Sequence, residues 1–79
     1  MLDKTTAIPI YYQLKEWLRS EIIVGIWKPG DLIPSERELS ERFEISRMTV
    51  RQALNELREE GVLRREQGRG TYVAEPKIE

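Results

Sequence analysis

SERELSERFEISRMTVRQALNEL, residues 35–57, is the stretch that decides the fold of this chain. Its first part predicts a short helix over residues 36–43. The segment Ser35–Glu38 is a capping box, in which the serine hydroxyl and the glutamate carboxylate each accept a hydrogen bond from the other residue's backbone amide. Leu39 and Phe43 lie four residues apart, so they give the helix one buried edge.

A second, longer helix is predicted to follow almost at once. Ser46 is its N-cap, and the helix is expected to run to about Glu60 and to stop at Gly61. Its buried side chains recur at the i, i+3, i+4, i+7 spacing and are Val50, Ala53, Leu54 and Leu57. Two helices joined by a tight turn indicate a helix-turn-helix, which places the N-terminus of the second helix outward.

Upstream of this motif the sequence predicts another helix over residues 9–24. Pro9 suits a first helical turn, where its missing N–H costs nothing, and Gly25 supplies a C-terminal stop. Leu32-Ile33, followed by Pro34, is too brief to form more than one edge strand. Residues 1–8 are aperiodic and are expected to be a flexible lead-in.

Downstream of Gly61 the apolar pattern changes from helical to extended. Residues 62–66 and 71–73 predict two strands, and the turn Gln67–Gly70 with its two glycines joins them as a hairpin. An isolated hairpin is marginal in water, so this one must lean on the helices or on Leu32-Ile33.

These elements and the length of 79 residues predict one domain. The expected fold class is α+β, a winged helix-turn-helix of three helices and a small antiparallel sheet with one wing, over residues 9–74. A polar tail follows at residues 75–79. Neither histidine nor cysteine occurs, so the common nucleophile–base pairs and the nitrogen or sulfur metal ligands are missing, and we expect no enzyme activity, metal site or cofactor. No membrane span or signal peptide is recognised, so a cytoplasmic location is expected.

The formal net charge of −1 is unusual for a protein that binds nucleic acid. The distribution of charge matters more than the sum, because phosphates are felt within about a Debye length, ~8–10 Å. Residues 46–74 hold six arginines against four glutamates, and three of those glutamates cluster near the end of the second motif helix. The acidic side chains can therefore face away from a basic edge.

The N-terminal turns of the helix that begins after Ser46 hold the candidate reading residues. Arg47 and Arg51 are four residues apart and share the exposed face. Arginine can contact guanine O6 and N7 with two hydrogen bonds, and Met48 or Thr49 could touch a thymine methyl. The amides at the helix start, together with the Ser46 hydroxyl, suit a phosphate. Without the motif around them, two such arginines would be read as a solvated surface.

The hairpin tip Gly68-Arg69-Gly70 is either a plain turn or a wing that enters a DNA groove. Glycine lets the backbone approach a groove closely, and arginine favours a narrow, electronegative minor groove. Arg64 and Arg65 alternate across the strand, so only one of them can lie on the DNA side, and the pattern does not say which. Arg37 has two equal readings, either as an ion-pair partner of Glu41 or plain surface residue, or as a contact to DNA backbone or base beside the second motif helix.

Several motifs together resemble the N-terminal domain of the GntR family of bacterial regulators, and in particular its HutC subfamily. They are Pro9–Gln13, Pro34–Leu39, Ser46–Leu54, Glu60–Leu63 and Gly68–Val73, and they occur in the family's order. The resemblance covers roughly residues 8–74, which is nearly the whole chain. It implies a dimeric regulator, usually a repressor, whose winged domain reads a palindromic operator in double-stranded DNA.

The resemblance also implies a set of DNA contacts and a missing partner domain. The implied contacts are Arg37, Ser46, Arg47, Met48, Thr49 and Arg51, with Gln67, Gly68, Arg69 and Gly70 at the wing. Members of the subfamily continue into a C-terminal domain that senses a small-molecule effector. The tail at residues 75–79 is therefore expected to lead to a domain that is absent from this chain.

Glu44 departs from the family pattern, since relatives often have glycine at this corner of the helix-turn-helix. If the corner needs a positive φ, a glutamate there costs about 1–2 kcal/mol of strain. We expect the fold to survive, with Glu44 pointing away from DNA. Two other functions remain open on the residues alone, namely a winged helix for protein–protein contact and a DNA binder without sequence preference. A third rival, an enzyme, is disfavoured by the missing histidine and cysteine.

Overall fold

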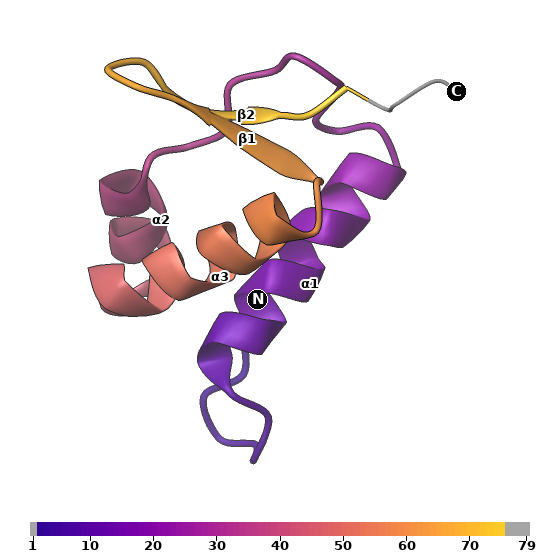
Figure 1. Cartoon of the computed structure of the whole chain (residues 1–79). Helices are drawn as coiled ribbons and strands as arrows, with labels where there is room; N and C mark the ends of the chain where they lie inside the picture. The colour runs from indigo at the N-terminus through magenta and orange to yellow at the C-terminus, as the bar shows by residue number, and fades with distance from the viewer. Residues whose placement is uncertain (1, 76–79) are drawn as a thin grey trace.

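The computed structural model describes residues 2–75. The elements are α1 (Ile10–Ile23), α2 (Glu36–Phe43), α3 (Arg47–Glu59), β1 (Leu63–Glu66) and β2 (Gly70–Val73). Figure 1 shows the three helices below a hairpin that spans the top of the molecule, with its tip above α2. The predicted α+β winged helix-turn-helix, with its three helices and one two-stranded wing, is confirmed.

The core forms where α1 crosses α3 beneath the hairpin (Figure 1). Leu14 and Leu18 of α1 are fully buried, as are Val50 and Leu57 of α3. The whole buried set is Leu14, Leu18, Ile33, Leu39, Phe43, Val50, Ala53, Leu54, Leu57, Leu63 and Val73, and all are hydrophobic. Each element contributes its apolar face to one cluster, as the spacing in the sequence predicts.

The start of α2 shows the predicted capping box. The Ser35 hydroxyl accepts from the Glu38 amide at 3.1 Å, and the Ser35 amide donates to the Glu38 carboxylate at 2.8 Å. Beyond α2, Glu44 has φ 56° and ψ 50°, the left-handed conformation that was the condition for strain at this corner. The Ser40 hydroxyl donates to the Ile45 carbonyl across the turn, so the surrounding structure holds the corner in place.

The hairpin is antiparallel, and its register pairs Leu63 with Val73 and Arg65 with Thr71. The predicted edge strand is a single bridge between Leu32 and Tyr72, extended by a hydrogen bond of 3.0 Å from the Ile33 amide to the Thr71 carbonyl. The wing is therefore anchored on two sides, by the segment before α2 and by the packing of Leu63 and Val73 into the core.

The segment that was predicted as a flexible lead-in makes several contacts. Gln13 of α1 accepts from the Asp3 amide and donates to the Asp3 carbonyl, both at 2.7 Å. The Lys4 ammonium donates to the Glu44 carbonyl at 2.6 Å, which joins this segment to the corner of the helix-turn-helix. Flexibility at residues 1–8 stays a prediction.

The predicted tail lies almost wholly outside the described residues, which end at Glu75. Among residues 2–75, no helix is long and apolar enough to cross a membrane. The same residues hold no group of three or more carboxylates placed to bind a metal ion.

Candidate nucleic-acid interface

The N-terminal end of α3 presents its polar side chains to solvent. The Ser46 hydroxyl caps the helix by accepting from the Thr49 amide at 3.1 Å, and the two hydroxyls are 2.8 Å apart. Arg47 and Met48 are exposed, Met48 to 77%. Because Val50 is fully buried on the opposite side, the capped end of α3 is held rigidly with these side chains facing outward.

Arg51, one turn further along α3, is exposed but engaged. Its Nε and Nη2 atoms each donate to one oxygen of the Glu36 carboxylate, both at 3.0 Å. This bidentate pair joins α3 to the first turn of α2. The Arg51 hydrogen bonds lower the pKa of the Glu36 carboxyl, and the charges of Arg51, Arg47 and Arg65 lower it further. The carboxylate thus lies amid three arginines.

The hairpin tip is exposed along its whole length, from Gln67 to Gly70. Gly68 has φ 78° and closes the turn, in which the Arg69 amide donates to the Glu66 carbonyl at 3.0 Å. Gly70 has φ 131°, and a Cβ atom there would come within 2.9 Å of the Leu32 side chain. Glycine is therefore favoured at position 70 by its positive φ, while the Leu32 methyl belongs to an exposed side chain that can move aside.

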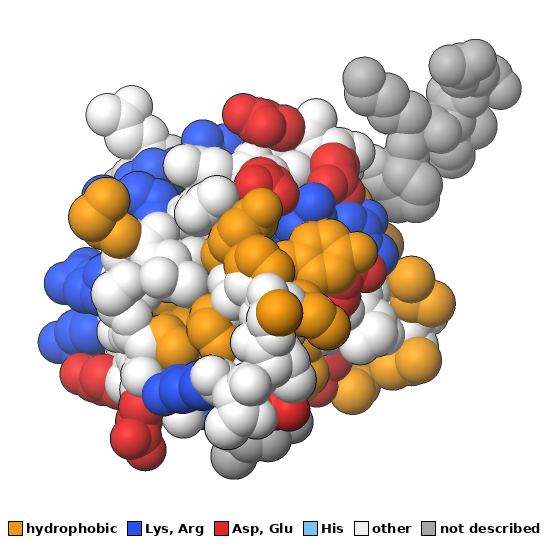
Figure 2. Space-filling model, turned by 90° about the horizontal axis from the view of Figure 1, so that it is seen from below, with side chains coloured by type: hydrophobic (Ala, Val, Ile, Leu, Met, Phe, Trp, Pro, Cys, Tyr) orange, Lys and Arg blue, Asp and Glu red, His pale blue; other side chains and the backbone are white. Residues whose placement is uncertain are grey.

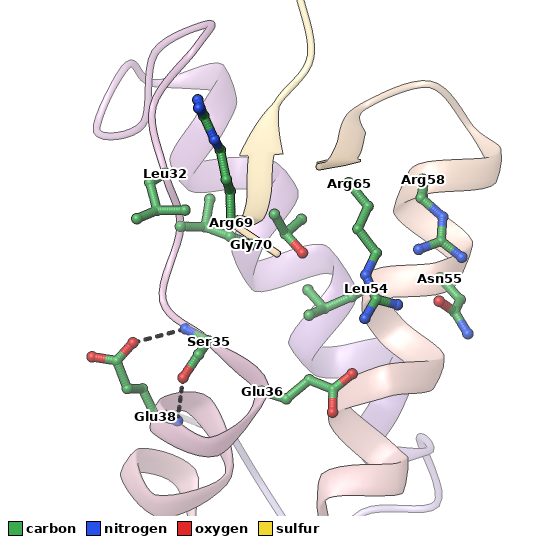
Figure 3. A pocket seen from close by; sticks show the side chains of 12 residues that line it. Leu32, Ser35, Glu36, Glu38, Leu54, Asn55, Arg58, Arg65, Arg69 and Gly70 are labelled. Carbon is green, nitrogen blue, oxygen red and sulfur yellow. Dashed lines mark hydrogen bonds between the residues drawn. The ribbon is translucent and has the colours of Figure 1, made fainter. Parts of the chain in front are cut away.

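The two neighbouring arginines of β1 lie in different surroundings. Arg64 forms an ion pair with Glu66 and lies 5.0 Å from the centre of the Tyr72 ring. Arg65 lines the hollow between the hairpin and α3. In Figure 3, Arg65 extends from β1 along α3, whereas Arg69 points away from α3. Arg65 therefore lies on the side of α3, whereas Arg64 lies against Tyr72.

The sequence analysis missed Asn55 and Arg58, which lie further along α3. Figure 3 shows both side chains beside Arg65 on the wall of the same hollow, which has a volume of about 210 Å³. Helical spacing places both on the exposed side of α3, but only the position of the hairpin brings them next to Arg65. The helical spacing thus indicated that Asn55 and Arg58 are accessible, but nothing in the sequence indicated that they lie beside Arg65.

Unpaired basic side chains concentrate on this side of the molecule. Figure 2 shows a row of basic side chains along the edge where Figure 1 places α2 and the tip of the hairpin. Within residues 2–75, no ion pair is found for Arg37, Arg47, Arg58, Arg65 or Arg69. Arg37 is exposed, so the reading in which it pairs with a nearby glutamate has no contact to support it.

The fold and this face define a winged helix-turn-helix domain with a basic recognition helix. The chain matches the family "Bacterial regulatory proteins, gntR family" over residues 10–73, and it belongs to that family. The curated relatives of this chain are much longer transcriptional regulators.

Two curated relatives illustrate the likeness. The HTH-type transcriptional repressor NagR of Bacillus subtilis is 54% identical over 78 residues, which are 99% of this chain and 32% of that protein. The histidine utilization repressor of Klebsiella aerogenes is 49% identical, over 94% of this chain and 31% of that protein. The chain therefore spans about a third of the length of these relatives. Both are named as repressors and neither as an enzyme.

Solved structures show the same fold at the level of the domain. AraR(DBD) in complex with operator ORR3 is 40% identical, with a TM-score of 0.84 over 94% of this chain and 89% of that one. YtrA from Sulfolobus acidocaldarius, a GntR-family transcription factor, is 32% identical, with a TM-score of 0.87 over 99% of this chain and 66% of that one.

Proposed function

We propose that this chain is the operator-reading domain of a bacterial transcriptional repressor and binds double-stranded DNA with sequence preference. The observation that carries the proposal is the rigidly capped N-terminus of α3, with its exposed arginines beside a basic wing. The AraR domain, which shares this fold at 40% identity, was solved in complex with an operator. The shared fold supports the same kind of ligand here.

The geometry supports a division of labour between the helix and the wing. The N-terminal half of α3 enters the major groove, which is about 12 Å wide and admits a helix with its side chains. Arg47 reads a base edge there, while the Ser46 and Thr49 hydroxyls and the helix N-terminus face a phosphate. Arg69 at the wing tip enters the adjacent minor groove, where a narrow groove attracts arginine.

The proposed contact set keeps every residue that the sequence indicates and adds two. It consists of Arg37, Ser46, Arg47, Met48, Thr49, Arg51, Gln67, Gly68, Arg69 and Gly70, together with Arg58 and Arg65. Arg58 and Arg65 lie between the recognition helix and the wing, where a DNA strand would pass, so their role is to bind phosphates. Their exposure and the absence of an ion pair for either within residues 2–75 support that role.

In the whole protein, we infer a cytoplasmic homodimer that recognises a palindromic operator. A dimer places two copies of α3 on one face of the duplex, about one helical turn apart. The relatives are about three times as long as this chain, which leaves room for a C-terminal domain that binds a small-molecule effector. By itself, the winged domain binds DNA weakly because it lacks the doubled contacts of the dimer.

Selection of bound duplexes from a random pool tests this function. The chain is expected to enrich one short sequence, and its affinity for that duplex is expected to fall steeply with salt. Each neutralised phosphate contributes about 0.9 to the slope of log affinity against log salt concentration. Enrichment of no sequence would indicate a DNA binder without preference, and an affinity that does not change with salt would indicate a protein-binding domain. Either result would overturn the proposal.

A further inference from the structure

Glu36 occupies an unusual place for an acidic residue in a DNA-binding face. It is the first residue of α2, and its side chain is 22% exposed. Its two oxygens accept from Nε and Nη2 of Arg51 at 3.0 Å each, across fifteen residues of sequence. A planar guanidinium held by two parallel hydrogen bonds has a defined orientation, which a single contact does not give.

The pair leaves the reading edge of Arg51 available. A guanidinium has five N–H donors in a fixed fork. Glu36 engages the side edge, made of Nε and Nη2, and the end edge between Nη1 and Nη2 remains. That end edge can donate to guanine O6 and N7 while the side edge stays bound to the carboxylate.

The surroundings of Glu36 keep it ionised and in place. Its position in the first turn of α2 favours a negative charge, because the helix dipole is positive there. The capping box at the same end of α2 uses Ser35 and Glu38, so the fold does not need Glu36 as a cap. The Glu36 carboxylate therefore has no part in the cap, and both of its oxygens are engaged by Arg51 of α3.

We propose that Glu36 is a positioning residue that sets the base specificity of Arg51, by holding the guanidinium with its end edge turned toward a guanine in the major groove. This inference rests on the proposed DNA-binding function. Glu36 contacts no base itself. Its negative charge lies close to the phosphates and so weakens DNA binding. Its hydrogen bonds restrict Arg51 to one orientation and so increase the preference for one base pair.

The test compares Glu36→Gln with the unmodified chain on the duplex that the unmodified chain selects from a random pool, and on duplexes that carry a single base-pair change in it. Glutamine keeps the shape of the side chain but offers only one acceptor, and its amide faces the arginine donors. The preference for one particular guanine-containing pair is expected to fall about tenfold, within the range of a good bidentate contact. Affinity for random duplex is expected to stay the same or rise.

Arg51→Lys and Glu41→Gln complete the design. Lysine cannot form the fork, so Arg51→Lys is expected to lose preference at the same base pair. Because Glu36 acts through Arg51, the variant that carries both substitutions is expected to lose no more preference than Arg51→Lys alone. Glu41 is an exposed glutamate of α2 outside the proposed interface, so Glu41→Gln controls for the removed charge. Thermal unfolding of each variant checks the fold.

Each outcome decides one claim. If the unmodified chain selects no sequence, the proposed function itself fails. If it selects one and Glu36→Gln raises affinity for every duplex equally, with unchanged preference, then Glu36 only competes with phosphates and the inference is overturned. A change of preference at a base pair that Arg51→Lys does not affect would also overturn it.

Discussion

The two sides of α3 use their charges in different ways. On the side that packs against α1, Lys15 forms ion pairs with Glu56 and Glu60, and Arg19 pairs with Glu16 and Glu60. On the opposite side Arg51 pairs with Glu36, whereas Arg47 and Arg58 have no ion pair within residues 2–75.

This difference explains how a chain with a net charge of −1 can bear a basic binding face. Glu56 and Glu60, at the C-terminal end of α3, form ion pairs with the basic side chains of α1, far from the N-terminal end of α3. Charges that are paired inside the protein contribute little to the field beyond it, whereas unpaired arginines raise the local potential. The isoelectric point therefore averages over two regions with different roles.

The largest effect is expected where both regions depend on the same core. Leu57 of α3 is fully buried, and Leu57→Ala should lower the free energy of unfolding by about 2–5 kcal/mol, because a cavity is left behind. Urea denaturation measures this change. Because one small core supports both sides of α3, DNA binding should be lost along with the fold. A Leu57→Ala variant that keeps its free energy of unfolding and its DNA binding would contradict this prediction.

Arg47→Ala should separate the two sides. Because Arg47 is exposed and unpaired within the described residues, we expect no change in the urea midpoint. The preference for one base pair of the selected duplex should fall by about 1–3 kcal/mol. Fluorescence anisotropy with single-substitution duplexes measures the preference, and an unchanged affinity for the selected duplex would contradict the role of Arg47.

Arg69→Ala should produce a smaller and more uniform loss. A wing arginine in the minor groove reads groove width and potential more than base identity. Affinity is expected to fall by about 1 kcal/mol for all duplexes, which is the scale of one hydrogen-bonded contact. A loss confined to changes at a single base pair would count against a wing in the minor groove.

The ion pairs between α1 and α3 should show the smallest effect, which is present near neutral pH and is lost in acid. Hydrogen bonds from Lys15 and Arg19 lower the pKa of the Glu60 carboxyl below its ordinary value of 4.5. A carboxyl with a lowered pKa in the folded state contributes stability that is present above the ordinary value and lost as pH falls through the folded value. The melting temperature of the unmodified chain should therefore fall below about pH 4.5, and that of Glu60→Gln should fall less. Equal curves would show that the pairing is not felt.

Sequence patterns were most informative where the interactions are local. The capping box at Ser35, the N-cap at Ser46 and the apolar faces of the helices all depend on residues within a few positions of each other, so spacing alone predicts them. The family resemblance singled out Glu44 as a residue that would be strained if the corner needed a positive φ, and the structure has φ 56° there. Contacts of Asp3 and Lys4 with residues ahead in the chain had no such signal, because they join segments that no periodicity relates.

The candidate site divides along the same line. The exposed arginines at the start of α3 follow from helical geometry, since a residue four positions from another shares its face. Helical geometry does not predict three other features of the site, because each depends on where a distant segment is packed. They are the side on which Arg65 lies, the position of Asn55 and Arg58 next to it, and the pair between Glu36 and Arg51.

The sequence by itself determined which segments become helices and strands, which faces are apolar and which residues are available for binding, because these properties arise from neighbours along the chain. Tertiary structure alone decided which charges are paired with each other and which remain for a ligand. Coulomb attraction and hydrogen bonding act over a few ångströms of space, and α1, α2, α3 and the wing come within that range only when the core has formed.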